Sequence, residues 1–104
     1  MLIRVTEEDR PPFQLRRGEP SLSVFEEGAV IPPLSEDEVL GAFRPGSGVL
    51  RISREQVEHE GLQIVSVLGA EGLPTRLREA HAEIRPGLGM TRAQFKRSLK
   101  ELQP

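Results

Sequence analysis

The sequence predicts an α+β fold, in which a bent or split, mostly antiparallel sheet of five or six short strands packs against three short helices. Three observations support this expectation. Short segments alternate apolar and polar residues, which is typical of half-buried strands. Ten glycines and nine prolines divide these segments with turns. Ser35–Glu38, Ser53–Gln56 and Thr91–Gln94 each have the capping-box spacing ahead of a segment with helical character, which marks a helix start. With 104 residues, the chain has the length of a single domain, residues 1–104.

A strand, a short helix and a second strand form the expected centre of the fold. Residues 49–52 are apolar apart from Arg51, which suits a half-buried strand. Ser53 and Gln56 have the capping-box spacing that starts the helix, and Gly61 fits the left-handed conformation that ends it. Residues 62–68 are the most β-prone segment of the chain. The connection of nine residues is shorter than the ~10–12 residues of a parallel crossover. We therefore expect the two strands in different parts of the sheet.

Four other segments have strand character: residues 1–5, 13–16, 21–25 and 81–85. The second of them is expected at an edge of the sheet, because prolines precede it and a turn follows it. For residues 75–80 two readings stay open, a helical turn or a continuation of the preceding loop.

Two further helices are expected. Ser35 starts the first, which should place Val39, Leu40 and Phe43 on the sheet. Thr91 and Gln94 start the second. Its apolar stripe of Phe95, Leu99 and Leu102 should face the core.

Composition excludes several classes of chemistry. The chain contains no cysteine, so disulfides, thiolate catalysis and Cys-ligated zinc are impossible. Its two histidines have no partner at a metal-ligand spacing, and we predict no metal site. No phosphate loop or nucleophile elbow occurs. No apolar run approaches the ~18 residues of a membrane helix, and we expect a soluble, cytoplasmic protein.

Candidate catalytic residues lie on two predicted strands. His81 and Glu83 are two residues apart, so a strand would place both on one face. Ser21 and Ser23 have the same spacing. If the two strands were neighbours, hydroxyls, imidazole and carboxylate would share a polar face. Ser23, His81 and Glu83 are therefore the candidate catalytic residues, and a structural ion pair at the sheet surface is the alternative.

The charge is unevenly distributed along the chain. Residues 1–75 carry seven basic and thirteen acidic side chains, and residues 76–104 carry seven basic and three acidic ones. The basic candidates for nucleic-acid binding are Arg92, Lys96, Arg97 and Lys100. A solvated face of an amphipathic helix, in a fold whose oppositely charged parts attract each other, is the favoured alternative.

Several short motifs occur in the order of a known family. They are Ser23-Val24-Phe25, Val49-Leu-Arg-Ile52, Gly61-Leu-Gln-Ile64, His81-Ala-Glu-Ile84, Pro86, Met90 and a closing helix with Phe95 and Leu99. This order resembles the second half of the compact, NAD-linked ADP-ribosyltransferase-like effectors exported by type VI secretion. The chain departs from the family pattern at Ala82, where the family has an aromatic residue, and lacks its N-terminal Leu-Tyr-Arg strand. The resemblance implies NAD as a cofactor, with Ser23 positioning the nicotinamide ribose and His81 or Glu83 polarising it.

These observations leave three functional hypotheses. The first is a cofactor-free protein that acts through contact with a protein partner or as a homodimer, as an accessory or toxin–antitoxin-type component. The second is a reduced NAD-binding transferase or glycohydrolase. The third is a weak nucleic-acid binder. For a homodimer, the C-terminal helix or an uncovered strand such as residues 13–16 would supply the contact.

Overall fold

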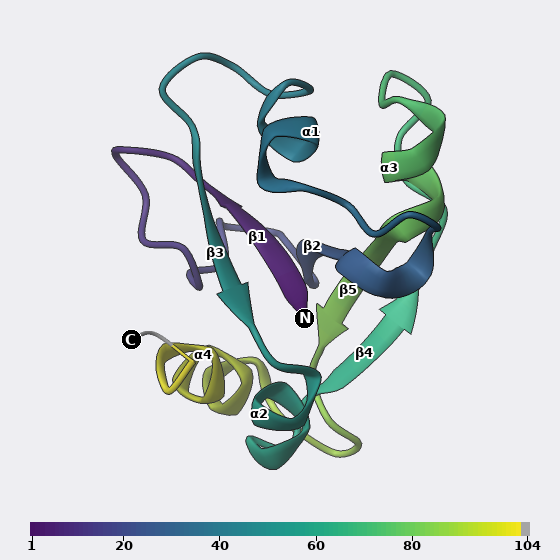
Figure 1. Ribbon diagram of the computed structural model, residues 1–104. Coiled ribbons are helices and arrows are strands. Elements are labelled where there is room, and N and C mark those ends of the chain that lie inside the picture. Colours follow the sequence, from purple (N-terminus) through teal and green to yellow (C-terminus); the bar gives the residue numbers. More distant parts are fainter. Residues whose placement is uncertain (103–104) are drawn as a thin grey trace.

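The computed structural model describes residues 1–102, which fold around one five-stranded sheet (Figure 1). The strands are β1 (Leu2–Thr6), β2 (Leu22–Glu26), β3 (Gly48–Ile52), β4 (Gln63–Ser66) and β5 (His81–Arg85). Their spatial order is β3-β1-β2-β5-β4, and all neighbours are antiparallel. The helices are α1 (Glu36–Leu40), α2 (Arg54–His59), α3 (Thr75–Ala80) and α4 (Arg92–Lys100), with a 3₁₀ turn η1 (Glu27–Ala29). The α+β prediction is confirmed, with a single continuous sheet.

Helices cover both faces of the sheet. In Figure 1, α1 and α3 lie above it and α2 and α4 lie below it. The lower core contains Phe95 and Leu99 of α4 and Val57 of α2, and the upper core contains Val39 of α1 and Leu77 of α3. Because successive strand residues point to opposite faces, β1 buries apolar side chains on both sides of the sheet. Burial of apolar surface on two faces is the main force that stabilises the layered arrangement.

Each predicted capping residue begins a helix. The Ser35 hydroxyl accepts a hydrogen bond from the backbone three residues later, and so does Ser53. At α4 the capping box is complete: Thr91 Oγ1 accepts from Gln94 N, and Gln94 Oε1 accepts from Thr91 N at 2.8 Å. These local bonds satisfy backbone donors that the helices leave free at their first turns.

The two strands of the expected central unit lie at opposite edges of the sheet, as their short connection predicted. Gly61 follows α2 with a φ of +78°, which confirms the left-handed helix exit. The turn after β5 passes very close to this point. A Cβ atom built on Gly87 would lie only 2.0 Å from the carbonyl oxygen of Gly61. A side chain at residue 87 would therefore clash with the backbone of residue 61 unless the two segments moved apart.

Three expectations require correction. Residues 13–16 form a loop, so the predicted edge strand is wrong, and it offers no strand for a dimer contact. The alternation there has another cause: Phe13 and Leu15 are buried in the lower core. Residues 75–80 form a helix, so the structure contains four α-helices where we expected three. Helix α1 ends at Leu40, and Phe43 packs on the upper core from the turn that follows.

Candidate functional site

The predicted polar face exists. Strands β2 and β5 are neighbours, and Ser23 lies directly opposite Glu83 in the register. His81 lies on the same face, two residues from Glu83 and opposite Phe25. Ser23 is exposed, whereas the other two side chains are half-buried. The three predicted residues come from two distant segments of the chain, and the fold brings them together on one face of the sheet.

The side chains of His81 and Glu83 already have partners within the fold. Oε1 of Glu83 accepts two hydrogen bonds from Arg85, at 3.0 and 2.7 Å. Nδ1 of His81 lies 2.8 Å from the carbonyl oxygen of Val67. Because a carbonyl only accepts, Nδ1 carries the proton and Nε2 is left with the free lone pair in the neutral ring. The imidazole also stands edge-on to Phe25, with ring centres 5.7 Å apart. Chemically, this face offers a hydroxyl, an imidazole and a carboxylate paired with a guanidinium.

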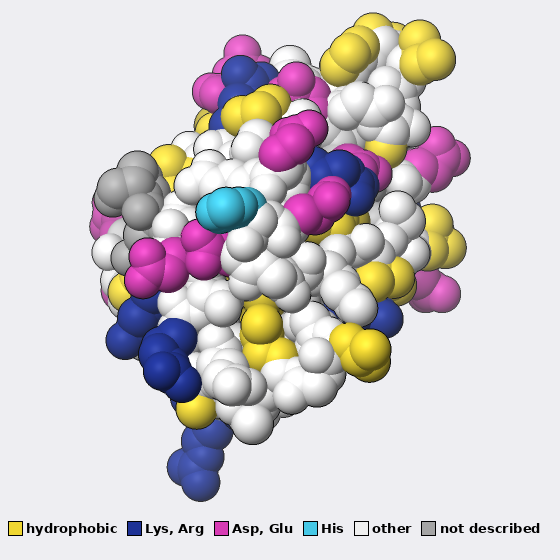
Figure 2. All heavy atoms as spheres, turned by 90° about the horizontal axis from the view of Figure 1, so that it is seen from below, with side chains coloured by type: hydrophobic (Ala, Val, Ile, Leu, Met, Phe, Trp, Pro, Cys, Tyr) yellow, Lys and Arg dark blue, Asp and Glu magenta, His cyan; other side chains and the backbone are white. Residues whose placement is uncertain are grey.

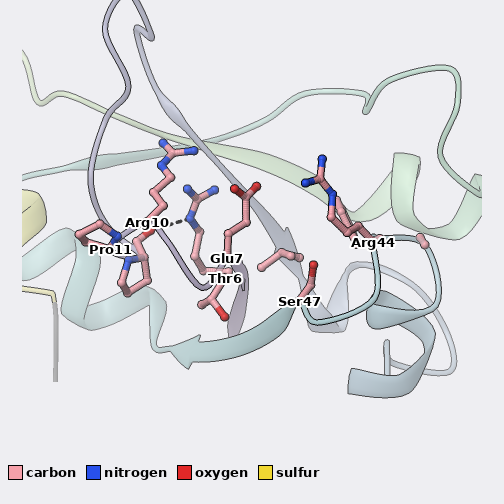
Figure 3. A pocket seen from close by; sticks show the side chains of 11 residues that line it. Thr6, Glu7, Arg10, Pro11, Arg44 and Ser47 are labelled. Carbon is pink, nitrogen blue, oxygen red and sulfur yellow. Dashed lines mark hydrogen bonds between the residues drawn. The ribbon is translucent and has the colours of Figure 1, made fainter.

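A hollow of about 340 Å³ lies at the end of β1 (Figure 3). Its polar lining comes from two segments, residues 4–10 and the loop of residues 44–47: Arg4, Thr6, Glu7, Arg10, Arg44 and Ser47. Figure 3 shows Glu7, Arg10 and Arg44 extending from their backbones toward the same side. Sequence reasoning assigned no role to this group. The available signal was Arg4, a charged residue between the apolar residues Ile3 and Val5 of the strand.

Arg4 is the buried charged residue of this hollow, with 9% of its surface exposed. Its Nε donates to the carbonyl oxygen of Pro12 at 2.7 Å, the dashed line in Figure 3, and its Nη1 donates to that of Ser23 at 2.9 Å. Nη2 makes no hydrogen bond with any residue from 1 to 102. Burial, reinforced by the positive charge of Arg10, lowers the pKa of Arg4 to about 10. The side chain therefore remains a cation at neutral pH.

The carboxylates near Arg4 are shared with other arginines. Glu19 accepts from Nη2 of Arg10 at 2.7 Å and from the backbone N–H of Arg16 at 2.5 Å. Burial opposes ionisation of Glu19, but the Arg16 N–H and the charge of Arg10 outweigh it and lower its pKa. Glu7 pairs with Nη2 of Arg16 at 2.9 Å. Arg44 forms no ion pair within the part of the chain that the structure describes.

The four basic residues predicted for nucleic-acid binding have different environments. Arg92 donates to the carbonyl oxygens of Glu19 at 2.5 Å and Arg16 at 3.1 Å, and so fixes the loop between β1 and β2. Lys96 and Lys100 line a hollow of about 430 Å³ beside Phe13. The fourth, Arg97, is exposed elsewhere on α4. Figure 2 shows basic side chains gathered at one end of the face that carries α2 and α4. Nucleic-acid binding here stays a prediction.

Strand β4 is an unprotected edge of the sheet. Its neighbour is β5 alone, and nothing lies beyond it in Figure 1. Val67 N donates to His81 O, so by alternation Val65 also faces β5, while Ile64 and Ser66 point their N–H and C=O groups outward. These outward groups have no partner among residues 1–102. The strand carries no charge, and Leu68 just after it is 65% exposed.

The fold and these sites define the chain as a small α+β protein with a two-sided sheet. No protein-family model, no characterised protein and no solved structure matches it. Within residues 1–102, no three histidine, aspartate or glutamate side chains are placed to hold a metal ion together. None of the helices described there has the length and apolarity to cross a membrane.

Proposed function

We propose that this protein acts through protein–protein contact, as an accessory component that pairs with a second copy of itself along β4. The single observation that carries the proposal is the uncharged, unpaired edge of β4 (Gln63–Ser66). Natural sheets normally protect such an edge with charged side chains, proline, a bulge or a covering element. Strand addition at a free edge is a common mode of protein recognition.

The hydrogen-bond pattern of β4 suits antiparallel pairing about a twofold axis. With Val65 opposite its own copy, Ile64 of one chain faces Ser66 of the other, and each such pair exchanges two backbone hydrogen bonds. The strand has no ionised side chain, so self-pairing brings no like charges together.

The opposite edge of the sheet is less suited to this role. Strand β3 carries Arg51, which forms an ion pair with Glu27 at 2.9 Å and approaches Glu36 at 3.6 Å. Self-pairing of β3 would crowd these charges or require their rearrangement. The contrast between the two edges is the reason for assigning the contact to β4.

The test is the mass in solution by light scattering over a range of concentrations. A contact of one short strand buries less than the ~1,200 Å² of a standard interface, so we expect a weak, concentration-dependent dimer. Ser66→Pro removes an outward N–H that has no partner in the monomer, and it should abolish the dimer without unfolding the protein. Ser66→Thr keeps this N–H and should dimerise like the wild type. A monomer at all concentrations, or a dimer unaffected by proline, would contradict the proposal.

A reduced NAD-binding, ADP-ribosyltransferase-like enzyme is the second candidate. The observation that favours it is that Ser23 lies opposite Glu83 and on the same face of the sheet as His81. Under this proposal Ser23 positions the nicotinamide ribose, and the free Nε2 of His81 or the Glu83 carboxylate polarises it.

A thermal-shift series with NAD tests this candidate. NAD at 100-fold over its dissociation constant should add about 2.7 kcal/mol of stability. Ser23→Ala should weaken the shift, whereas Ser21→Ala, at a half-buried serine just outside the strand, is the matched control and should leave the shift unchanged. An unchanged melting temperature at millimolar NAD would contradict NAD binding.

A further inference from the structure

The hollow at the end of β1 contains a buried cation with an unused donor. Arg4 is nine-tenths buried, and two of its three nitrogens bond to carbonyl oxygens of the protein. The third, Nη2, has no partner in residues 1–102, although its residue lines the hollow. No carboxylate of residues 1–102 lies within ion-pair distance of Arg4. Burying a guanidinium in this way is costly, and an anion seated against it would offset that cost.

Other donors surround the same space. Nε of Arg10 is buried and has no hydrogen-bond partner among the described residues. The Arg44 guanidinium is not engaged by any carboxylate there, and Ser47 adds a hydroxyl from the same loop. These groups belong to two separate segments, residues 4–10 and 44–47, and both segments line the hollow (Figure 3).

The charge balance favours an anion. Three guanidinium groups and one carboxylate, Glu7, line the hollow, which gives a formal charge of +2. Glu7 also divides its charge between the hollow and Arg16, which it contacts at 2.9 Å. Arg10 is also paired with Glu19 at 2.7 Å, so among residues 1–102 the positive charge without a paired carboxylate resides on Arg4 and Arg44.

We propose that this hollow binds the phosphate group of a small molecule. Guanidinium groups match phosphate oxygens in geometry, and a tetrahedral phosphate has enough oxygens to accept from several of the arginines and the hydroxyl that line the hollow. A planar carboxylate has only two oxygens to share among them. The volume of about 340 Å³ lies at the lower end of the ~300–1,000 Å³ range of small-molecule sites, which fits inorganic phosphate or a small phosphate monoester. This site is separate from the β4 edge and does not depend on it.

The test is an NMR titration of the full chain with inorganic phosphate and with glycerol phosphate at constant ionic strength. Saturable shifts should centre on the backbone signals of Arg44 and Ser47. A charge-assisted hydrogen bond is strong enough that Arg44→Gln should weaken binding about tenfold or more. Glu7→Gln removes the competing negative charge and should tighten binding, a gain that misfolding would not produce. Arg97→Gln, an equal loss of charge on α4, should leave the affinity unchanged.

The outcomes separate the two sources of phosphate. Tighter binding of glycerol phosphate than of inorganic phosphate identifies a phosphorylated metabolite as the ligand class, and equal affinities identify inorganic phosphate itself. Shifts that do not saturate, or equal effects of Arg44→Gln and Arg97→Gln, would overturn the proposal. Melting temperatures of each variant in phosphate-free buffer verify that the fold is retained.

Discussion

Gly87, in the turn between β5 and α4, allows a sharp test of how this turn packs against the end of α2. A Cβ atom at this position would lie 2.0 Å from the Gly61 carbonyl oxygen, whereas ordinary contacts begin near 3.4 Å. The substitution Gly87→Ala therefore requires the two backbones to separate by about 1.4 Å, the difference between these distances. Gly61 has little freedom to move, because its φ of +78° fixes the exit from α2.

Overpacking of this kind costs about 1–3 kcal/mol, and the closeness of two backbones places Gly87→Ala toward the upper half of that range. A loss of about 2 kcal/mol is a large part of the ~5–15 kcal/mol that stabilises a domain of this size. It should lower Tm by roughly 10 °C.

Urea denaturation followed by circular dichroism measures the loss of stability. The matched control is Gly28→Ala in η1, where a Cβ meets nothing within 4 Å. This control should be neutral or slightly stabilising, because alanine reduces the entropy of the unfolded chain. Equal stabilities of the two variants would refute the predicted close approach of residues 61 and 87.

Two further predictions concern helix starts and pH. Thr91→Ala removes the side chain that caps α4 and should cost about 1 kcal/mol in a urea titration; an unchanged midpoint would argue against the complete capping box. The hydrogen bond from Arg76 lowers the pKa of Glu38, so the folded form binds this proton less readily than the unfolded form. The pair therefore stabilises the fold above the ordinary glutamate pKa of about 4.3, and its contribution disappears as the pH falls through the lowered folded-state value. Arg76→Gln should be less stable than the wild type at pH 7 but not at pH 2, and a difference that persists at pH 2 would contradict this cause.

The features that the sequence predicted correctly are mainly local. The caps at Ser53 and Thr91 and the left-handed Gly61 depend on residues within one helical turn. The prediction of a strand at residues 13–16 was wrong, because alternating apolar and polar residues indicate which side chains are buried but not whether the backbone pairs with a neighbouring strand. Phe13 and Leu15 bury their side chains from a loop, which Arg92 holds through backbone carbonyls.

The candidate sites depended on contacts that sequence alone does not specify. Ser23 and Glu83 are sixty residues apart in the chain, and only the order of strands in the sheet shows that they are neighbours. The buried Arg4 was visible as a charge within an apolar strand, but its bonds to two distant carbonyls arise from the folded loop. The spacing of residues along the chain therefore predicted the polar face of Ser23, His81 and Glu83, but it gave no information about the hollow at the end of β1.

Hydrogen exchange of the β4 amides at increasing protein concentration is the most direct test of the proposed contact. The amides of Val65 and Val67 face β5 and should be protected at every concentration. The amides of Ile64 and Ser66 face outward; they should exchange rapidly in dilute protein and become protected as two copies pair. Protection of Ile64 and Ser66 that does not change with concentration would contradict pairing along this edge.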